Sequence, residues 1–218
     1  MTVGLLLVDD HPIVVDGLRA ALGGHDEIAV VGQASTLAEA RDRIVDPAVD
    51  VVLLDLRLPD GSGADLLLDM QQMASPPAVI VLSSFLTSQY VSAAITLGAS
   101  GFLLKTAPTE EIIAAIAVVA DGRLAFSAEQ LRASRGAAWA PLSAREHEII
   151  EGVMAGRSND ELSADLGLAR KTVEAYISRL FVRFDVATRT ELGILAEREQ
   201  ILALPVDRRR PNSGGSPR

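Results

Sequence analysis

The sequence predicts a doubly wound α/β domain with a five-stranded parallel sheet, followed by a small all-helical domain. In the first half, five short apolar runs alternate with segments of helical period. In the second half, strand-like runs stop after Leu104, and capping signals mark the starts of short helices. At 218 residues, the chain is long for one small domain and sufficient for two.

The apolar runs of the first half are the expected strands, with a helix after each. Strands are predicted at residues 3–8, 28–32, 51–54, 78–82 and 101–104. Helices are predicted near residues 14–22, 37–44, 64–73, 88–97 and 110–120. Thr36 and Glu39 form a capping-box signature at the second helix. Right-handed crossovers then place helices on both faces of one sheet, which is the flavodoxin-like class.

Polar residues follow four of these apolar runs. Asp9 and Asp10 follow the first, Asp55 the third, Ser83 the fourth and Lys105 the fifth. Because parallel strands end at the same edge of a sheet, these side chains are expected to meet where open α/β sheets bind their ligands.

Three acids beside a hydroxyl and an ammonium indicate phosphate chemistry. Neighbouring carboxylates repel one another, and a hard cation with oxygen ligands, above all Mg²⁺, relieves the repulsion. Asp55 is the candidate nucleophile, with Lys105 as its charge partner and Ser83 as a hydrogen-bond donor. The alternative is that each residue is a cap or turn residue, which is easy to accept for one position but hard for all five.

Three segments of this half resemble the receiver domain of bacterial two-component response regulators. They are Leu-Val-Asp-Asp-His-Pro at 7–12, Leu-Leu-Asp-Leu-Arg-Leu-Pro-Asp-Gly at 53–61 and Gly-Ala-Ser-Gly-Phe-Leu-Leu-Lys at 98–105. The resemblance covers roughly the first 120 residues. It implies that Asp55 accepts a phosphoryl group from a sensor histidine kinase.

The same resemblance implies roles for the surrounding residues. Asp9 and Asp10 bind Mg²⁺ with Asp55, aided by the backbone carbonyl of Arg57. Ser83 turns toward the new phosphate while Phe102 changes rotamer, so phosphorylation acts as a switch. His11 is expected to begin the first helix with Pro12 rather than to bind metal.

The second half has the pattern of a helix-turn-helix. Residues 123–140 are a mixed Ala, Ser, Arg and Gly stretch, which predicts a linker. Ser143 with Glu146 and Ser158 with Glu161 are capping boxes, and Gly167 falls before the next periodic run. Helix, glycine turn, helix is the arrangement that presents a helix to a DNA groove.

The run from Lys171 is the predicted recognition helix. Its apolar residues share one helical face: Val173, Tyr176, Ile177, Leu180 and Phe184. The opposite face mixes small, hydrogen-bonding and basic groups, which suit base edges and phosphates. An ordinary amphipathic helix with a solvated face remains the alternative from periodicity alone.

Residues 142–146, 156–168 and 171–180 resemble the LuxR-type helix-turn-helix, and both halves together resemble the NarL/FixJ class of response regulators. The resemblance implies two sets of DNA contacts. Base contacts are expected from Lys171, Glu174, Ala175 and Ser178, and phosphate contacts from Arg170, Arg179 and Arg183. For a further amphipathic helix predicted at 190–204, the resemblance implies a role in forming a homodimer on double-stranded DNA. Packing within the domain core alone is the alternative for this helix.

Charge and composition agree with this division. Residues 1–128 carry 6 Lys and Arg against 16 Asp and Glu, whereas residues 129–218 carry 14 against 13. The chain has no cysteine, no run near the roughly 20 apolar residues of a membrane span and no basic leader, so a cytoplasmic protein is expected.

We therefore predict a transcription regulator that is not an enzyme. Its expected parts are a receiver at 1–122, a linker at 123–140, a helix-turn-helix domain at 141–204 and a disordered tail at 205–218. Two alternatives are an aspartyl-phosphate hydrolase and a constitutive DNA-binding regulator whose receiver is never phosphorylated. The hydrolase needs a second acid two residues after its nucleophile, where Arg57 stands.

Overall fold

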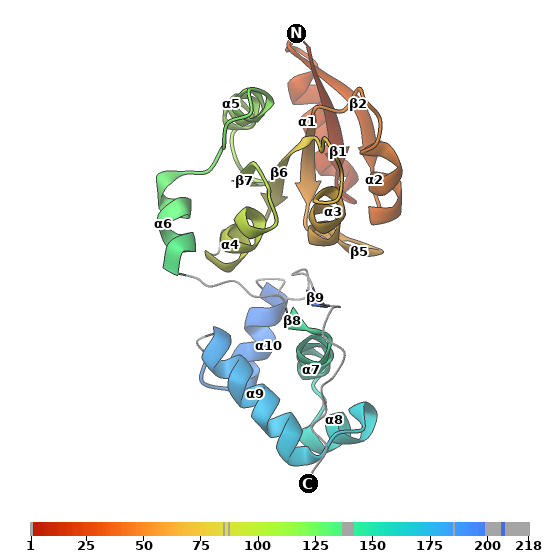
Figure 1. Ribbon diagram of the computed structural model, residues 1–218. Coiled ribbons are helices and arrows are strands. Elements are labelled where there is room, and N and C mark those ends of the chain that lie inside the picture. Colours follow the sequence, from red (N-terminus) through yellow and green to blue (C-terminus); the bar gives the residue numbers. More distant parts are fainter. Residues whose placement is uncertain are drawn as a thin grey trace. The chain divides into compact units, whose positions relative to one another are not determined.

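The computed structural model describes residues 2–84, 86, 88–136, 142–184, 186–198 and 206–207. They belong to two compact units, Met1–Ala140 and Pro141–Arg218, each of which is described by itself (Figure 1). Among the described residues, no helix has the length and apolar character needed to cross a membrane.

The first unit is built on a five-stranded parallel sheet in the order β2-β1-β3-β6-β7, which confirms the predicted class. The strands are β1 (Val3–Val8), β2 (Ile28–Ala34), β3 (Val51–Asp55), β6 (Ala78–Ser83) and β7 (Gly101–Leu104). All five begin where predicted, and β2, β3 and β6 extend slightly further. Asp55 and Ser83 are therefore the last residues of their own strands.

Helices cover both faces of this sheet (Figure 1). They are α1 (Pro12–Leu22), α2 (Leu37–Arg43), α3 (Gly63–Met70), α4 (Ser88–Thr96) and α5 (Thr109–Ala120). Val15 of α1 and Ile116 of α5 share one core cluster with Leu103 of β7. Because side chains alternate along a strand, the fully buried Phe102 faces the opposite layer, where α4 packs on β7.

At the start of α2, only one of the two hydrogen bonds of the predicted capping box is present. Thr36 Oγ1 accepts a hydrogen bond from the Glu39 amide at 3.1 Å, as expected. The Glu39 carboxylate instead accepts from the amide and hydroxyl of Ser35, one residue earlier. Asp60 accepts from the Leu37 amide at 2.6 Å, so a carboxylate distant in sequence satisfies a donor at this helix start.

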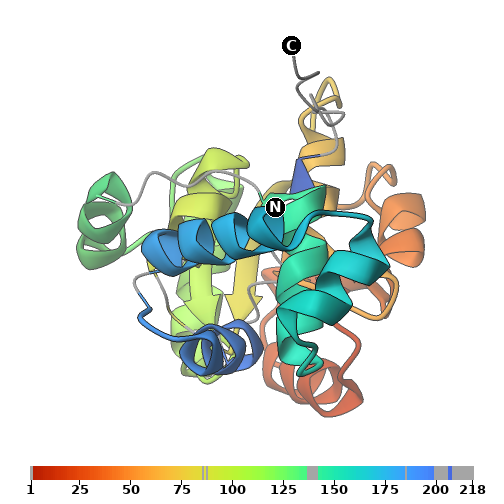
Figure 2. The ribbon, with the colours of Figure 1, turned by 90° about the horizontal axis from the view of Figure 1, so that it is seen from below.

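The segment after α5 is attached to the edge of the sheet. The Ala125 amide donates to the Ser100 carbonyl at 2.7 Å, and the Phe102 amide donates to the Ala125 carbonyl at 3.4 Å. Helix α6 (Ala128–Gly136) then lies beside α4 (Figures 1 and 2). Gln130 Nε2 donates to the Phe102 carbonyl at 3.1 Å. Part of the segment predicted as a linker thus contacts the strand that carries Phe102.

The described part of the second unit is mainly helical and includes a short parallel pairing of β8 (Leu142–Ser143) with β9 (Val206–Asp207). Its helices are α7 (Ala144–Met154), α8 (Asn159–Leu166), α9 (Arg170–Phe184) and α10 (Arg189–Arg198). Both predicted capping boxes are present, at Ser143 and at Ser158. Residues 199–204 of the predicted last helix, and the predicted tail except 206–207, lie outside the described residues.

A short turn leads from α8 into α9 (Figure 2), and Gly167 ends α8. Gly167 has a φ of 62°, in the left-handed region that favours glycine at the end of a helix. The predicted apolar face of α9 is confirmed: Val173, Ile177, Leu180 and Phe184 are buried, and Tyr176 is half-buried.

We expect Gln130→Glu to loosen the attachment of α6. Glutamate retains an oxygen to accept from the Ser127 amide, but its carboxylate has no donor for the Phe102 carbonyl. Hydrogen exchange of the 125–136 amides should become about tenfold faster, because one hydrogen bond is replaced by repulsion. Glu129→Gln, at the exposed neighbouring position, is the control and should leave exchange unchanged. Unchanged exchange in Gln130→Glu contradicts this role.

Candidate functional site

Three charged side chains meet at the carboxyl edge of the sheet. Lys105 Nζ lies 2.7 Å from Asp55 Oδ2 and 2.7 Å from Asp9 Oδ2. Asp9 and Asp55 are about 5% exposed. The parallel register brings together these residues, which are separated by as many as 96 positions in the sequence. This is the gathering of side chains that the strand ends predict.

Burial and the neighbouring charges shift the pKa values of Asp55 and Lys105 in opposite directions. Burial raises the pKa of Asp55, and the hydrogen bond from Lys105 only partly offsets it. Burial lowers the pKa of Lys105, but the bonds to Asp55 and Asp9 outweigh it, so the net shift is upward. Lys105 is therefore a firmly charged partner, and the ionised form of Asp55 depends on the cations around it.

The backbone around Asp55 is closely packed. The Arg57 amide donates to Asp55 Oδ1 at 3.2 Å, and Arg57 begins a short hairpin of β4 (Arg57–Leu58) and β5 (Gly61–Ser62). The hairpin leads to Gly63, whose amide donates to the Leu56 carbonyl. A Cβ on Gly63 would collide with the Asp55 carbonyl oxygen. Ser83 is buried at the end of β6, and its carbonyl accepts from the Lys105 amide at 2.8 Å.

His11 joins the acids. It is the N-cap residue of α1 with Pro12 in the first turn, which confirms that it begins the helix. Its Nδ1 also lies 2.9 Å from Asp9 Oδ1 and 2.8 Å from Asp10 Oδ1. One atom from each of Asp9, Asp10, His11 and Asp55 lies within 4.8 Å of the others. This acidic cluster is compatible with Mg²⁺, which prefers carboxylate oxygens.

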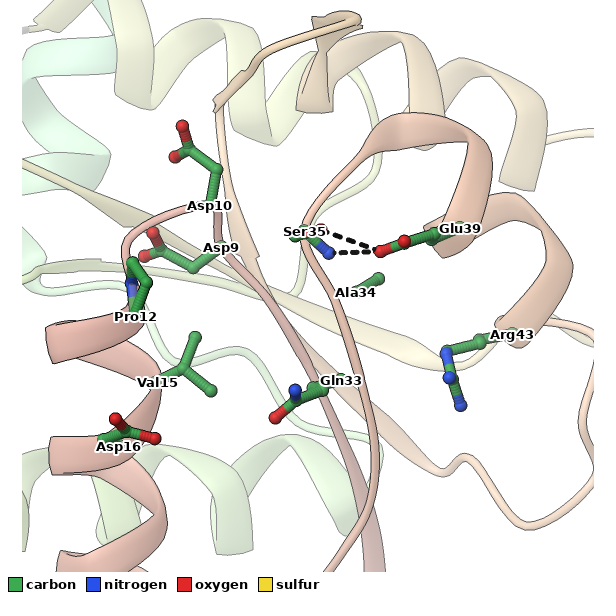
Figure 3. Close-up of a pocket in the computed structure, with 10 residues that line it drawn as sticks. All are labelled: Asp9, Asp10, Pro12, Val15, Asp16, Gln33, Ala34, Ser35, Glu39 and Arg43. Atoms are coloured by element: carbon green, nitrogen blue, oxygen red, sulfur yellow. Dashed lines mark hydrogen bonds between the residues drawn. The ribbon is translucent and has the colours of Figure 1, made fainter.

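A pocket of about 290 Å³ opens beside this cluster, between α1 and the turn from β2 to α2 (Figure 3). Asp9 and Asp10 line one side, and Ser35 and Glu39 line another. The Ser35 amide and hydroxyl both donate to the Glu39 carboxylate, so these two residues are already paired with each other. The cluster is therefore open to solvent through Asp10, which is 34% exposed.

The predicted DNA contacts lie on α9 in different surroundings. Five of them are exposed: Arg170, Lys171, Ala175, Ser178 and Arg179. The Arg179 guanidinium lies 4.4 Å from the centre of the Tyr176 ring, a cation–π contact. This contact holds one basic group along the helix surface.

The other basic side chains of α9 contact acids. Arg170 Nε donates to Glu174 Oε1 at 3.0 Å, and Arg170 also pairs with Asp160 of α8 at 3.2 Å. Arg183 is half-buried and lies 3.5 Å from Glu146 of α7. Both arginines therefore join α9 to another helix of the unit, Arg183 from a half-buried position and Arg170 from an exposed one.

Some of these partners are not predicted from the sequence. The capping-box pattern assigns Glu146 only to a helix start and does not single out Asp160, and periodicity does not show which distant acid meets which arginine. The one signal for His11 was its place directly after two predicted metal ligands.

Two family models match the chain, one for each unit. Residues 5–117 match the response regulator receiver domain, and residues 140–196 match the bacterial regulatory proteins of the luxR family.

Curated relatives and solved structures extend over nearly the whole length. The DNA-binding transcriptional activator DevR/DosR of Mycobacterium tuberculosis is 34% identical, covering 89% of this chain and 94% of its own. The transcriptional regulatory protein MctR of Rhizobium johnstonii is 33% identical, covering 86% and 90%. The crystal structure of the response regulator ChrA, from a heme-sensing two-component system, is 31% identical with a TM-score of 0.53, covering 92% and 98%.

We expect Gly63→Ala to destabilise the first unit. The new methyl group must displace backbone next to Asp55, which costs about 1–3 kcal/mol of unfolding free energy. Gly17→Ala, inside α1 with nothing within 4 Å of the new Cβ, should instead stabilise by about 0.5–1 kcal/mol. Urea unfolding of both variants measures the difference. Equal stability of the two would show that the backbone at Asp55 is not tightly packed.

Proposed function

The chain belongs to the two-component response regulators that join a receiver domain to a LuxR-type helix-turn-helix domain, and we propose that phosphorylation of Asp55 controls its DNA binding. Its relatives are DNA-binding transcriptional regulators, and the pairing of the two domains fits phosphorylation-activated regulation. The carrying observation is Lys105 Nζ at 2.7 Å from both Asp9 and Asp55, because a buried nucleophile is held beside a fixed cation. We divide the chain into a receiver at 1–122, a linker at 123–140 and a DNA-binding domain at 141–204.

The proposed reaction is phosphoryl transfer from a phosphohistidine of a sensor histidine kinase. An Asp55 carboxylate oxygen attacks phosphorus, so an O–P bond forms as the P–N bond breaks and the kinase imidazole leaves. Asp9, Asp10, Asp55 and the Arg57 carbonyl would hold Mg²⁺, which would supply countercharge for the phosphoryl oxygens when bound. Lys105, already hydrogen-bonded to Asp55 Oδ2, transfers its hydrogen bond to a phosphoryl oxygen.

The proposed switch begins at the ends of β6 and β7. Ser83 donates its hydroxyl proton in a hydrogen bond to the new phosphate, and Phe102 changes rotamer in the layer beside α4. Support comes from the burial of both side chains and from the Lys105 amide, which donates to the Ser83 carbonyl and links the two strand ends. Two discrete packings of one buried ring make a bistable element.

We propose that the protein binds DNA in the cytoplasm as a homodimer, which is assembled through its last helix. In this complex, α9 contacts the DNA. Lys171, Glu174, Ala175 and Ser178 approach base edges, with Glu174 accepting from cytosine N4. Arg170, Arg179 and Arg183 approach phosphates. The pairing of Arg170 with Glu174 adds a condition, because this exposed pair must separate or bind DNA together.

Two other functions predict different behaviour. An aspartyl-phosphate hydrolase needs an acid to activate water two residues after its nucleophile, and the exposed Arg57 occupies that position. A regulator that is never phosphorylated has no use for a lysine paired with two buried acids, since burying three charges is costly.

We expect Asp55→Asn to abolish phosphorylation. The wild type, given Mg²⁺ and a small phosphodonor, should gain one phosphoryl group by intact mass and bind DNA more tightly. The amide is a poor nucleophile, so the variant should do neither. Asp42→Asn, at an exposed position of α2, is the charge-matched control. Continuous release of phosphate would favour the hydrolase, and DNA affinity that ignores phosphorylation would favour the constitutive regulator.

We expect Glu174→Ala and Arg179→Ala to weaken DNA binding in different ways. Loss of the glutamate should relax selection at one base pair by about 1–3 kcal/mol. Loss of the arginine should weaken binding to all sequences and reduce the slope of log affinity against log salt by about 1. Binding to a panel of single-base operator variants at several salt concentrations separates these effects. Uniform weakening by Glu174→Ala contradicts base reading.

A further inference from the structure

His11 occupies a position that the proposed phosphorylation chemistry does not use. Its Nδ1 lies 2.9 Å from Asp9 Oδ1, 2.8 Å from Asp10 Oδ1 and 3.9 Å from Asp55 Oδ2. Its backbone amide also donates to Asp9 Oδ1 at 2.9 Å, which fixes the residue at the start of α1. The imidazole therefore belongs to the same cluster as the three acids.

These distances resemble those between ligands of one octahedral ion. With metal–ligand bonds of about 2.1 Å, adjacent ligands lie about 3.0 Å apart and opposite ligands about 4.2 Å apart. The distances from Nδ1 to Asp9 and Asp10 match adjacent positions, and the distance to Asp55 approaches that of opposite positions. The largest separation in the cluster, up to 4.8 Å, requires only a small closure.

The position of Nδ1 gives a reason for a cation here. Nδ1 faces one carboxylate oxygen of Asp9 at 2.9 Å and one of Asp10 at 2.8 Å, so a single cation could contact all three atoms. The ring is 59% exposed, so it can adjust as an ion enters from solvent. The other two histidines, His25 and His147, are not part of the cluster.

We propose that His11 is a nitrogen ligand of the receiver's cation site, and that it shifts the site's preference from Mg²⁺ toward divalent first-row transition ions. Carboxylates and water suit both Mg²⁺ and Mn²⁺, whereas imidazole binds transition ions far better than Mg²⁺. This inference rests on the proposed function in using the same acids. It adds a ligand from this chain that the three-acid site does not require.

Mn²⁺ is the probe that tests it, by electron paramagnetic resonance without any phosphodonor. Bound Mn²⁺ should show nitrogen-14 hyperfine coupling in the wild type and in His25→Ala, but none in His11→Ala or His11→Asn. Mn²⁺ affinity should fall about tenfold in both His11 variants, whereas Mg²⁺ affinity by competition should change less than about twofold. Asparagine is a good N-cap, so His11→Asn keeps the helix start.

Two results overturn the inference: wild-type Mn²⁺ without nitrogen coupling, or equal loss of Mn²⁺ and Mg²⁺ affinity in the His11 variants. The first would mean that Nδ1 contacts Asp9 and Asp10 without binding the metal ion. Mass measurement with Mg²⁺ and a small phosphodonor separates this failure from that of the proposed function. If His11→Asn still gains a phosphoryl group but binds Mn²⁺ like the wild type, only the inference fails. If the wild type gains none, the proposed function fails as well.

Discussion

The first unit is organised around the contact of one ammonium with two buried carboxylates. Lys105 Nζ lies 2.7 Å from both Asp9 and Asp55, and without it two acids would share a nearly dry site. Removing one partner of a buried ion pair costs about 3–5 kcal/mol of unfolding free energy. The strand ends, the strand register and the helix packing must therefore keep these three groups in contact. A site with three acids and one lysine still carries excess negative charge, which favours the binding of a cation.

That contact is also connected mechanically to the rest of the unit. Lys105 directly follows β7, whose buried Phe102 faces α4. The Phe102 amide donates a hydrogen bond to the Ala125 carbonyl, and the Phe102 carbonyl accepts one from Gln130 of α6. A change at the proposed phosphorylation site thus has a short route through covalent structure and hydrogen bonds to the segment that leads toward the DNA-binding domain. Coupling along this route is a proposal, and the contacts supply its physical basis.

The sequence predicted the strands closely because buried parallel strands are continuous apolar runs that end at polar residues such as Asp55 and Lys105. The helix starts at Ser143 and Ser158 were predicted equally well, since capping boxes are local sequence patterns. Contacts set by tertiary structure could not be predicted from the sequence. Nothing local shows that the Glu39 carboxylate accepts from Ser35 rather than from the Thr36 amide, that Arg183 meets Glu146, or that residues 125–130 hydrogen-bond to β7. His11 was predicted only to begin the first helix, although it directly follows two acids that are predicted metal ligands.

The most direct test of the account locates the phosphoryl group. Borohydride reduces an aspartyl phosphate to homoserine, so peptide sequencing by mass spectrometry identifies the modified residue after reaction with a phosphodonor and Mg²⁺. The account predicts homoserine at position 55 and at no other acid of the cluster. Homoserine at position 9 or 10, or a protein that gains no acyl phosphate, would contradict the assignment of Asp55 as the nucleophile beside Lys105.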